Sequence, residues 1–569
     1  MNDQLAQFLA EVGERYDSER QAVGVEWSGP GYHTRVVNGT WAHPTRESLD
    51  YALALLRGGE AGGAARASDI VRKVLTMQDT DPTSRTYGIW PWLLEEPLDE
   101  MAPPDWNWAD FCGIRLAHML VDHAESMPAE LRTAMRTAVG HAGWSVFRRN
   151  VQPSYTNIAI MGAGLAAIAG EVLDEAPLLE YGRRRLRNVV EHTAFHGGFS
   201  EYNSPTYTLV ALNECERILH LVNAEDIQED ARALWQHAWQ TVADHFHPGT
   251  GQWAGPHSRA YADRLAAPVA GFLAEQMGVP IAVHPQPGGR PMDTAWRVTI
   301  DHLPGPPELV ARFRALPKEP TVVRQRFVRR ASDALSTWGT TWLAGDICLG
   351  SVNHDTLWVQ RRPVIGYWRS ELDPAMVLRV RFLRDGQDFA SALIHNHQSE
   401  GELLSAVSLL TDKGDFHDHL DRPADGIFEA EDFRLRYELT GEGVSAEVMD
   451  VDRLLLVAAP YQAVIHTCPG QFGSYSVVWE VGQTAGQAHV DGICYRGKRR
   501  RFPLAEVGEV VLAAGLELLT TDQRPAESSP EVRRTGDDLL SVTWRAAGKH
   551  ALAAPLTART YAAAVVDGG

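Results

Sequence analysis

The sequence of 569 residues is poor in cysteine and lacks the short motifs of several enzyme classes. Its five cysteines are an odd number without any CxxC pair, which argues against a disulfide framework and against a structural zinc site. Phosphate-binding loops, zincins and α/β-hydrolases would show GxGxxG after a strand, GxxxxGK[ST], HExxH or GxSxG, and none of these occurs. The chemistry must therefore be sought in other residue patterns.

An excess of positive charge is also lacking. Lys and Arg number 53 against 73 Asp and Glu, a net charge of −20, so neither a nucleic acid nor a membrane is an expected partner. A local cluster of Arg, His and Asn can still bind an acidic ligand. No run approaches ~20 apolar residues, and residues 1–20 predict a polar amphipathic helix without the apolar segment of a signal peptide. We expect a cytoplasmic protein.

Hydrophobic periodicity divides the chain into two parts. Apolar residues recur at helical spacing over residues 107–127, 129–149, 156–175 and 204–223, as in a bundle, a solenoid or an α/α toroid. No fixed repeat supports the solenoid. Residues 278–320 form a Pro/Gly-rich connector, after which short β-branched and aromatic stretches alternate with turns. We predict a helical domain over 1–320, including the connector, and an antiparallel β-sandwich over 321–569.

Two stretches of the helical part carry candidate catalytic residues. In "TNIAIMGAGLAAIAGEVLD", Asn157 lies near the start of a helix with a small-residue face, where it could equally be a helix cap. In "GGFSEYNSPTYT", Glu201 and Tyr202 are expected to bind substrate, and Ser204 and Pro205 predict a helix start. Tyr207 then falls in the first turn, where the helix dipole favours a phenolate, although packing is the commoner role of a tyrosine.

Two further stretches offer titratable and cationic side chains. "WAGPHSRAYADRL" places His257, Arg259 and Tyr261 after a Gly-Pro turn, an arrangement that suits an anion but equally suits a solvated loop. "GSVNHDTLWVQRRPVIGYW" places His354 at a strand start and Arg361 after it, where the His-Asp pair could simply form a turn.

Tryptophans are concentrated in one segment. Four of them lie within nineteen residues, interleaved with proline and acids: Trp90, Trp92, Trp106 and Trp108. Tryptophans on loops stack against sugar rings, whereas core packing explains others of this kind. We predict that they bind substrate.

These motifs, taken together, resemble those of the heparinase II/III-like polysaccharide lyases, which include alginate lyases. In that family an Asn opens a helix of small residues, and Asn157 matches it, although the His that often follows is Ile158 here. The family also has a Gly-rich turn followed by a Glu and, after Ser-Pro, a Tyr. Glu201 and Tyr207 stand at the matching positions here. "GPHSR" and "NHDTLWV" match the family less closely. The resemblance covers most of the chain and implies an α/α toroid followed by a β-sandwich.

The resemblance implies β-elimination on a uronate-containing glycan. Asn157 would bind the carboxylate with help from His257, Arg259 or His354, and Tyr207 would act as base, acid or both. Neither a cofactor nor a metal is required, although a structural metal stays open. A glycoside hydrolase on the same scaffold, a uronate C5-epimerase and a non-enzymatic sugar-binding protein are the alternatives. The expected partner is an acidic oligosaccharide or polysaccharide, and self-association is left open.

Overall fold

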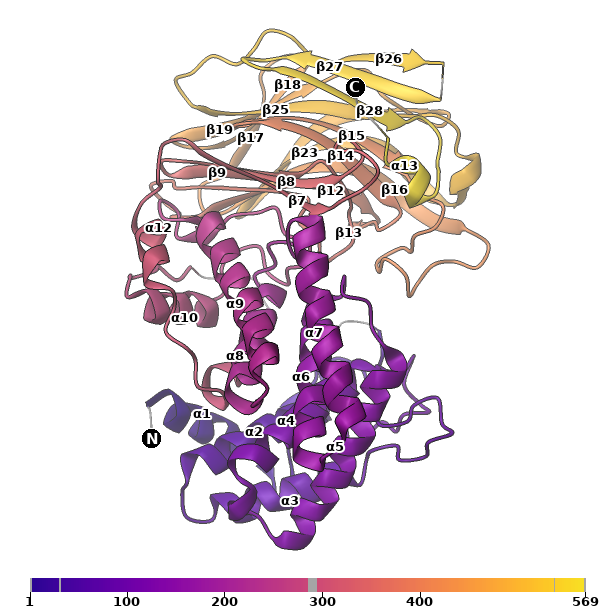
Figure 1. Ribbon diagram of the computed structural model, residues 1–569. Helices are drawn as coiled ribbons and strands as arrows, with labels where there is room; N and C mark the ends of the chain where they lie inside the picture. Colours follow the sequence, from indigo (N-terminus) through magenta and orange to yellow (C-terminus); the bar gives the residue numbers. More distant parts are fainter. Residues whose placement is uncertain (1–2, 30–31, 285–293, 537, 567–569) are drawn as a thin grey trace. The chain divides into compact units, whose positions relative to one another are not determined.

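The computed structural model describes the chain except for residues 1–2, 30–31, 285–293, 537 and 567–569 (Figure 1). The chain divides into two units. The helical unit comprises Met1–Ala194, Tyr207–Trp239 and Arg290–Gly305, and the β unit comprises Phe195–Thr206, Gln240–Gly289 and Pro306–Gly569. The predicted fold class, helices followed by an antiparallel β domain, is confirmed. The division near residue 320 stays a prediction, and the first long strand begins at Thr321.

Long helices make up most of the helical unit. They are α1 (Asp3–Gly13), α2 (Thr45–Gly58), α3 (Gly63–Leu75), α4 (Asn107–Asp122), α5 (Ala129–Arg149), α6 (Thr156–Leu173), α7 (Ala176–His196), α8 (Tyr207–Leu221) and α9 (Glu225–His245). The last residues of α7 and of α9 belong to the β unit. The short α11 (Trp296–Thr299) follows in sequence. Two-residue strands between α1 and α2 are too short to show a period in the sequence.

Helices α2, α4, α6 and α8 run parallel to one another. At their N-terminal ends, Trp108 of α4 donates its indole hydrogen to the Thr45 hydroxyl of α2 over 3.0 Å. Towards their C-terminal ends, Arg217 of α8 donates to His118 of α4 over 2.5 Å. Helices that meet start to start and end to end are parallel. The chain returns between them through α3, α5 and α7, and the long segment 76–106 joins α3 to α4. This alternation is that of the predicted α/α toroid.

Charged residues are paired inside this unit. Arg115 of α4, which is buried, makes a two-pronged hydrogen bond to the buried carboxylate of Asp50 in α2, with distances of 2.8 and 3.2 Å. A fork of this kind satisfies both groups in a medium of low dielectric constant. It fixes the register between α2 and α4.

Helix α6 lies in the centre of the helical unit, and every residue from Thr156 to Gly170 is buried. A Cβ atom at Gly164 would lie 2.9 Å from a side-chain carbon of Ile218, so the small residues permit close packing as predicted. Among the described residues, α6 is the one helix long and apolar enough to cross a membrane by composition. Because 83% of it is buried within the protein, it has the character of a core helix.

Two large antiparallel sheets form the β unit (Figure 1). One has the order β10 (His354–Thr356), β14 (Ala392–Ser399), β15 (Glu402–Leu409), β25 (Ala513–Thr520), β19 (Tyr461–Thr467), β18 (Arg453–Ala458) and β17 (Ser445–Val448). The other has the order β22 (Val478–Thr484), β23 (Gln487–Pro503), β16 (Ile427–Thr440), β12 (Met376–Arg384), β11 (Val364–Trp368), β9 (Ile347–Val352), β8 (Thr337–Ala344) and β7 (Thr321–Val328), with β13 (Gln387–Asp388) beside β12. The strands predicted from the period of two are present.

The core of the β unit lies between these sheets. Leu403 and Ile465 of the first sheet and Phe382 and Leu435 of the second belong to one buried apolar cluster. A third sheet covers the outer face of the first: β26 (Glu531–Thr535), β27 (Leu539–Arg545) and β28 (Lys549–Pro555), with Trp544 in a second cluster. The predicted sandwich therefore has an additional layer.

Short elements from the middle of the chain also belong to the β unit. They are β5 (Phe246–His247), β6 (Gln252–Trp253), α10 (Ala267–Met277) and α12 (Val310–Arg314). A Cβ atom at Gly249, in the turn between β5 and β6, would lie 2.0 Å from the carbonyl oxygen of Gly345 in the turn between β8 and β9. The backbones are thus in direct contact there. The central part of the predicted connector, 285–293, lies outside the described residues.

Candidate active site

The candidate residues of the β unit lie on two loops that Asn203 joins. Asn203 has a left-handed backbone with φ of 47°, and its side-chain amide donates to the carbonyl oxygens of Ala254 and Pro256 over 2.8 and 2.9 Å. Its side-chain oxygen accepts the indole hydrogen of Trp253 over 2.5 Å. All the hydrogen-bonding groups of this amide are therefore used to hold the loop around residues 254–260 against residues 201–204.

His257 is held as a neutral imidazole. Its Nδ1 lies 2.7 Å from the carbonyl oxygen of Asn203, and because a carbonyl only accepts, Nδ1 carries the hydrogen. Burial lowers the pKa of His257 to about 3. Its backbone exchanges hydrogen bonds of 3.1 and 2.9 Å with Arg362. The ring is thus oriented with a lone pair on Nε2, which makes it a base and not a cation at neutral pH.

Arg259 lies two residues further along the same loop. Its guanidinium donates to Glu201 over 2.9 Å and to Gln360 over 2.8 Å, and it lies 5.8 Å from the ring centre of Trp358. These contacts fix the direction of the guanidinium, while the Glu201 carboxylate offsets part of its charge. Glu201 thus positions Arg259. Tyr261, the next predicted binding residue, has half of its surface exposed.

Glycines allow this loop to lie directly on strand β9. A Cβ atom at Gly350 would lie 1.9 Å from the carbonyl oxygen of Gly255, and one at Gly255 would lie 2.1 Å from a methyl carbon of Ile365. Real Cβ atoms do not approach backbone atoms this closely. The position of His257 therefore depends on the absence of side chains at both residues.

His354 and Arg361 occupy different surroundings. Arg361 pairs with Asp355, which precedes it in sequence by six residues. His354 lies next to Asp355 in β10, so its side chain points to the opposite face, where its Nε2 lies 3.1 Å from the Thr337 hydroxyl. Burial lowers the pKa of His354 to about 3. His354 packs inside the β unit, its hydrogen bond does not connect it with the loop of His257, and its catalytic role stays a prediction.

Tyr202 requires a correction. Its side chain is 1% exposed, its ring stacks on Phe327 at 4.5 Å, and its hydroxyl lies 2.8 Å from Nε2 of His245. A ring enclosed in this way offers no face to a sugar. The predicted binding residue is a core residue of the β unit.

In the helical unit, Tyr207 is the first residue of α8 and is partly buried. The expectation that it lies in the first helical turn is confirmed, although the helix begins two residues later than Ser204 and Pro205 predicted. The Ser204 hydroxyl donates to the carbonyl oxygen of Arg259 over 2.5 Å. The N-terminal dipole of α8 stabilises negative charge at Tyr207.

Asn157 is the second residue of α6 and is buried. Because α2, α4, α6 and α8 are parallel, their N-terminal ends, and with them Asn157 and Tyr207, lie at the same end of the helical unit. At this end Arg149 donates to Asn107 over 2.7 Å, and Asn107 donates to the Tyr155 hydroxyl over 3.3 Å. Several positive helix ends combined with amide and arginine donors favour an anion.

The four tryptophans are mostly core residues. Trp90 is fully buried, and its indole hydrogen bonds to the carbonyl oxygen of Val74 over 3.0 Å. Trp92 and Trp108 are 7% and 8% exposed, with their rings 4.9 Å apart. We correct the prediction for these three, because packing uses their faces. Trp106 is partly buried, with its indole hydrogen on the carbonyl oxygen of Arg85, and stays a candidate.

One group of side chains at the opposite, C-terminal end of these helices has the spacing of a metal site. His118, Asp122 and His220 offer ligand atoms within 4.8 Å of one another. Arg217, which can only donate, bonds to Nδ1 of His118. Nε2 therefore carries the hydrogen and donates it to Asp122 over 3.0 Å, which leaves it no lone pair for a metal. The sequence did not reveal this group, because 98 residues separate Asp122 from His220.

Comparison with known proteins gives a distant likeness. Residues 27–277 match a family described as Domain of unknown function (DUF8769). No curated protein sequence matches the chain. Solved structures with a similar arrangement include heparinase III, at 10% identity over 90% of this chain and 82% of that chain, with a TM-score of 0.43.

Two further structures carry the names of lyases. A mutant heparan sulfate lyase from Pedobacter heparinus matches with 9% identity and a TM-score of 0.38, and the match covers 97% of this chain and 94% of that chain. A chondroitin AC lyase of Streptomyces coelicolor A3, in complex with chondroitin sulphate, has 11% identity, covers 94% and 83%, and has a TM-score of 0.47. These values describe a distant likeness in fold, and no residue role follows from them.

Proposed function

We propose that the protein cleaves a uronate-containing glycan by β-elimination. The observation that carries this proposal is the loop of His257 and Arg259, which presents an oriented neutral imidazole and a fixed guanidinium two residues apart. β-Elimination needs a base for the C5 proton and a donor that neutralises the neighbouring carboxylate. Both kinds of group are present on one loop.

Tyr207 and Asn157 complete the proposed set of catalytic residues. The Tyr207 hydroxyl is the second group able to take the C5 proton, and it can return a proton to the departing O4 oxygen. In the helical unit, the Asn157 amide is the group proposed to bind the uronate carboxylate. His257 is neutral and has a free lone pair on Nε2, but its pKa of about 3 makes it a weaker base than Tyr207.

The alternative hydrolase needs two available carboxylates on either side of a sugar. Glu201 is paired with Arg259, and Glu95 lies 2.5 Å from His43. Asp110 is buried, and burial raises its pKa to about 7. Each of these acids already has a structural partner or an enclosed position, which favours the lyase. An epimerase shares the first proton abstraction and is separated by its product. The cytoplasmic location stays a prediction of the sequence.

A double-mutant cycle measures whether the contributions of Tyr207 and His257 to the rate depend on each other. Tyr207→Phe, His257→Gln and the double variant are assayed on a panel of uronate glycans by the ultraviolet absorbance of the C4–C5 double bond. We expect each single change to lower kcat/KM by about 100-fold or more, and the double variant to lose much less than the product of both. Tyr475→Phe in the β unit is the control.

The outcomes separate the candidate functions. Chain cleavage without ultraviolet absorbance would establish a hydrolase, and deuterium uptake at C5 without cleavage would establish an epimerase. Near-normal product formation by Tyr207→Phe would refute the role proposed for that residue.

A further inference from the structure

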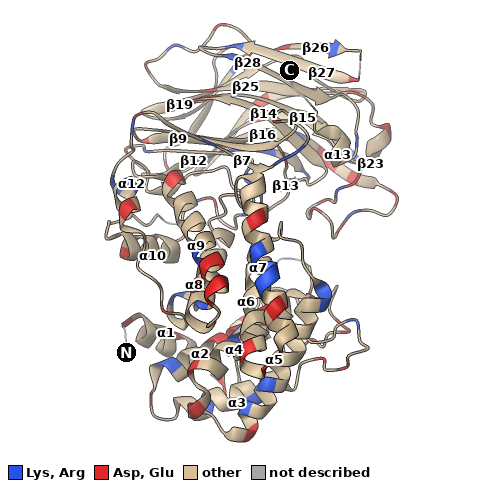
Figure 2. Cartoon of the chain, viewed as in Figure 1, with Lys and Arg blue, Asp and Glu red and all other residues tan. Residues whose placement is uncertain are grey.

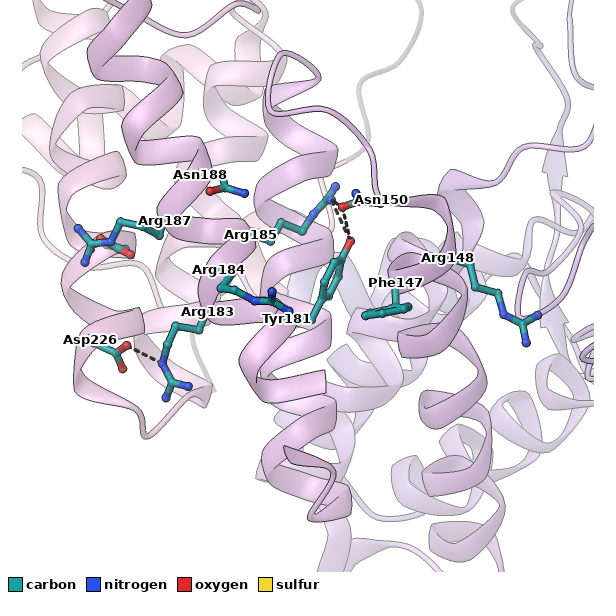
Figure 3. Close-up of a pocket in the computed structure, with 11 residues that line it drawn as sticks. Phe147, Arg148, Asn150, Tyr181, Arg183, Arg184, Arg185, Arg187, Asn188 and Asp226 are labelled. Atoms are coloured by element: carbon teal, nitrogen blue, oxygen red, sulfur yellow. Dashed lines mark hydrogen bonds and ion pairs between the residues drawn. The ribbon is translucent and has the colours of Figure 1, made fainter. Parts of the chain in front are cut away.

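The helical unit has a cavity of about 730 Å³ between the C-terminal end of α5, the middle of α7 and the first turns of α9 (Figure 3). Its lining contains two acids, Asp226 and Asp230, and five arginines: Arg148, Arg183, Arg184, Arg185 and Arg187. Five positive charges against two negative ones leave an excess of three. Four of these arginines lie between residues 183 and 187 of α7, in a chain with a net charge of −20 (Figure 2).

Three of the arginines already have hydrogen-bond or ion-pair partners within the protein. Arg183 donates to Asp226 over 2.6 Å, and Arg187 lies 3.0 Å from Asp230. Arg148 donates to the carbonyl oxygen of Pro82 over 2.8 Å and points away from the other side chains (Figure 3). These contacts leave Arg184 and Arg185 as the groups able to bind a ligand.

Arg184 is the exposed member of this pair and Arg185 the buried one. The Arg184 side chain is 66% exposed, and its Nε lies 3.6 Å from Glu180, beyond a normal hydrogen bond. Arg185 is 5% exposed and donates to Asn150 and Tyr181 over 3.3 and 3.0 Å. Its Nη2 is buried and has no hydrogen-bond partner among the described residues. A buried donor of a charged group without an acceptor is costly, and a nearby anion or the water around it removes that cost.

An aromatic surface lies beside the two guanidinium groups. The ring of Phe147 is 39% exposed and lies 4.9 Å from the ring of Tyr181 (Figure 3). An exposed aromatic ring next to arginines suits a sugar ring that carries an acidic group, because the ring stacks on C–H groups and the guanidinium binds the anion. A bare inorganic anion would not use the ring.

We infer that this cavity binds an anionic glycan segment, with a sulfate or carboxylate group on Arg184 and Arg185 and a sugar ring on Phe147. The inference deepens the proposed function, since it assigns a second site for the same class of ligand. Arg185 also donates to the carbonyl oxygen of Ala159 over 3.2 Å, two residues after Asn157 in the first turn of α6. The cavity therefore lies behind the helix end that holds Asn157.

Binding, and not turnover, tests this inference. The full chain carrying Tyr207→Phe is titrated by calorimetry with a sulfated uronate hexasaccharide, a neutral glucose hexasaccharide and inorganic pyrophosphate. Arg184→Ala and Phe147→Ala are added in turn. Arg72→Ala, in α3 with a side chain 45% exposed, is the matched control.

We expect Arg184→Ala to weaken binding of the sulfated hexasaccharide by about tenfold, and added salt to weaken it further. Phe147→Ala should weaken the hexasaccharide but leave pyrophosphate unchanged, and Arg72→Ala should leave both unchanged. Equal affinity in Arg184→Ala and the unchanged protein, or pyrophosphate binding without hexasaccharide binding, would overturn the inference. Failure of the proposed catalysis would leave these affinities unaffected, so the two failures are distinguishable.

Discussion

Gly350→Ala tests whether the loop of His257 depends on close contact with β9. The added methyl group would lie 1.9 Å from the carbonyl oxygen of Gly255 and 2.1 Å from its carbonyl carbon. Both are backbone atoms, so no side-chain rotation relieves the overlap. An ordinary van der Waals contact needs 3.4 Å or more, and the loop must therefore retreat by about 1.5 Å.

The size of this movement sets the expected losses. Inserting a methyl group into packed structure costs about 1–3 kcal/mol of unfolding free energy. A displacement of about 1 Å at a catalytic group can cost about 100-fold in rate. We therefore expect kcat/KM to fall by at least that factor. The fall should be seen at a temperature where the variant is still folded, so unfolding does not account for it.

The assay combines urea unfolding with the ultraviolet measurement of product. Gly536→Ala is the control, because apart from its chain neighbours no described residue has an atom within 4 Å of the added methyl group, and the backbone there is not left-handed. A Gly350→Ala protein with unchanged stability would refute the packing argument. A destabilised variant that keeps full activity while folded would refute the catalytic importance of the loop.

Three further predictions concern charge. The free energy of unfolding should fall as pH decreases from about 6.5 towards about 3. In that range His257 binds a proton in the unfolded chain but not in the folded protein, where burial lowers its pKa to about 3. Equal urea midpoints at pH 7 and pH 5 would contradict this prediction. Arg259→Lys should raise KM by about tenfold, since an ammonium cannot reproduce the fork that includes Gln360, and unchanged initial rates at low substrate would exclude that role. Asp50→Ala should lower the unfolding free energy by about 3–5 kcal/mol by leaving Arg115 buried without its carboxylate, and a loss below about 1 kcal/mol would contradict the pairing.

Local patterns were sufficient for the secondary structure and for part of the site. The apolar spacing predicted the helices, and the Gly-Pro turn before His257 predicted a loop with Arg259. Tyr207 was placed in a first helical turn because proline favours such positions. These features depend on residues close together in the sequence, where propensity and turn chemistry decide the outcome.

Contacts between distant segments were not predictable. Asn203 joins two loops some fifty residues apart, and nothing in its neighbourhood distinguishes it from an ordinary turn residue. Burial of Trp90 and Tyr202 depends on which segments pack around them. The tautomer of His257 follows from a carbonyl oxygen contributed by the other loop, and its neutral state follows from burial. A single sequence carries no signal for such pairings.

The way the chain is shared between the units limits how it can be divided. Residues 240–289 belong to the β unit although they precede its long strands by several dozen residues. A fragment beginning at residue 321 would lose β5, β6 and the loop that covers Gly350, and so would expose to water a strand that the whole chain keeps covered. The shortest folded form of the sandwich is therefore longer than the segment that contains its long strands. The part that this segment lacks carries His257 and Arg259, which are proposed for catalysis.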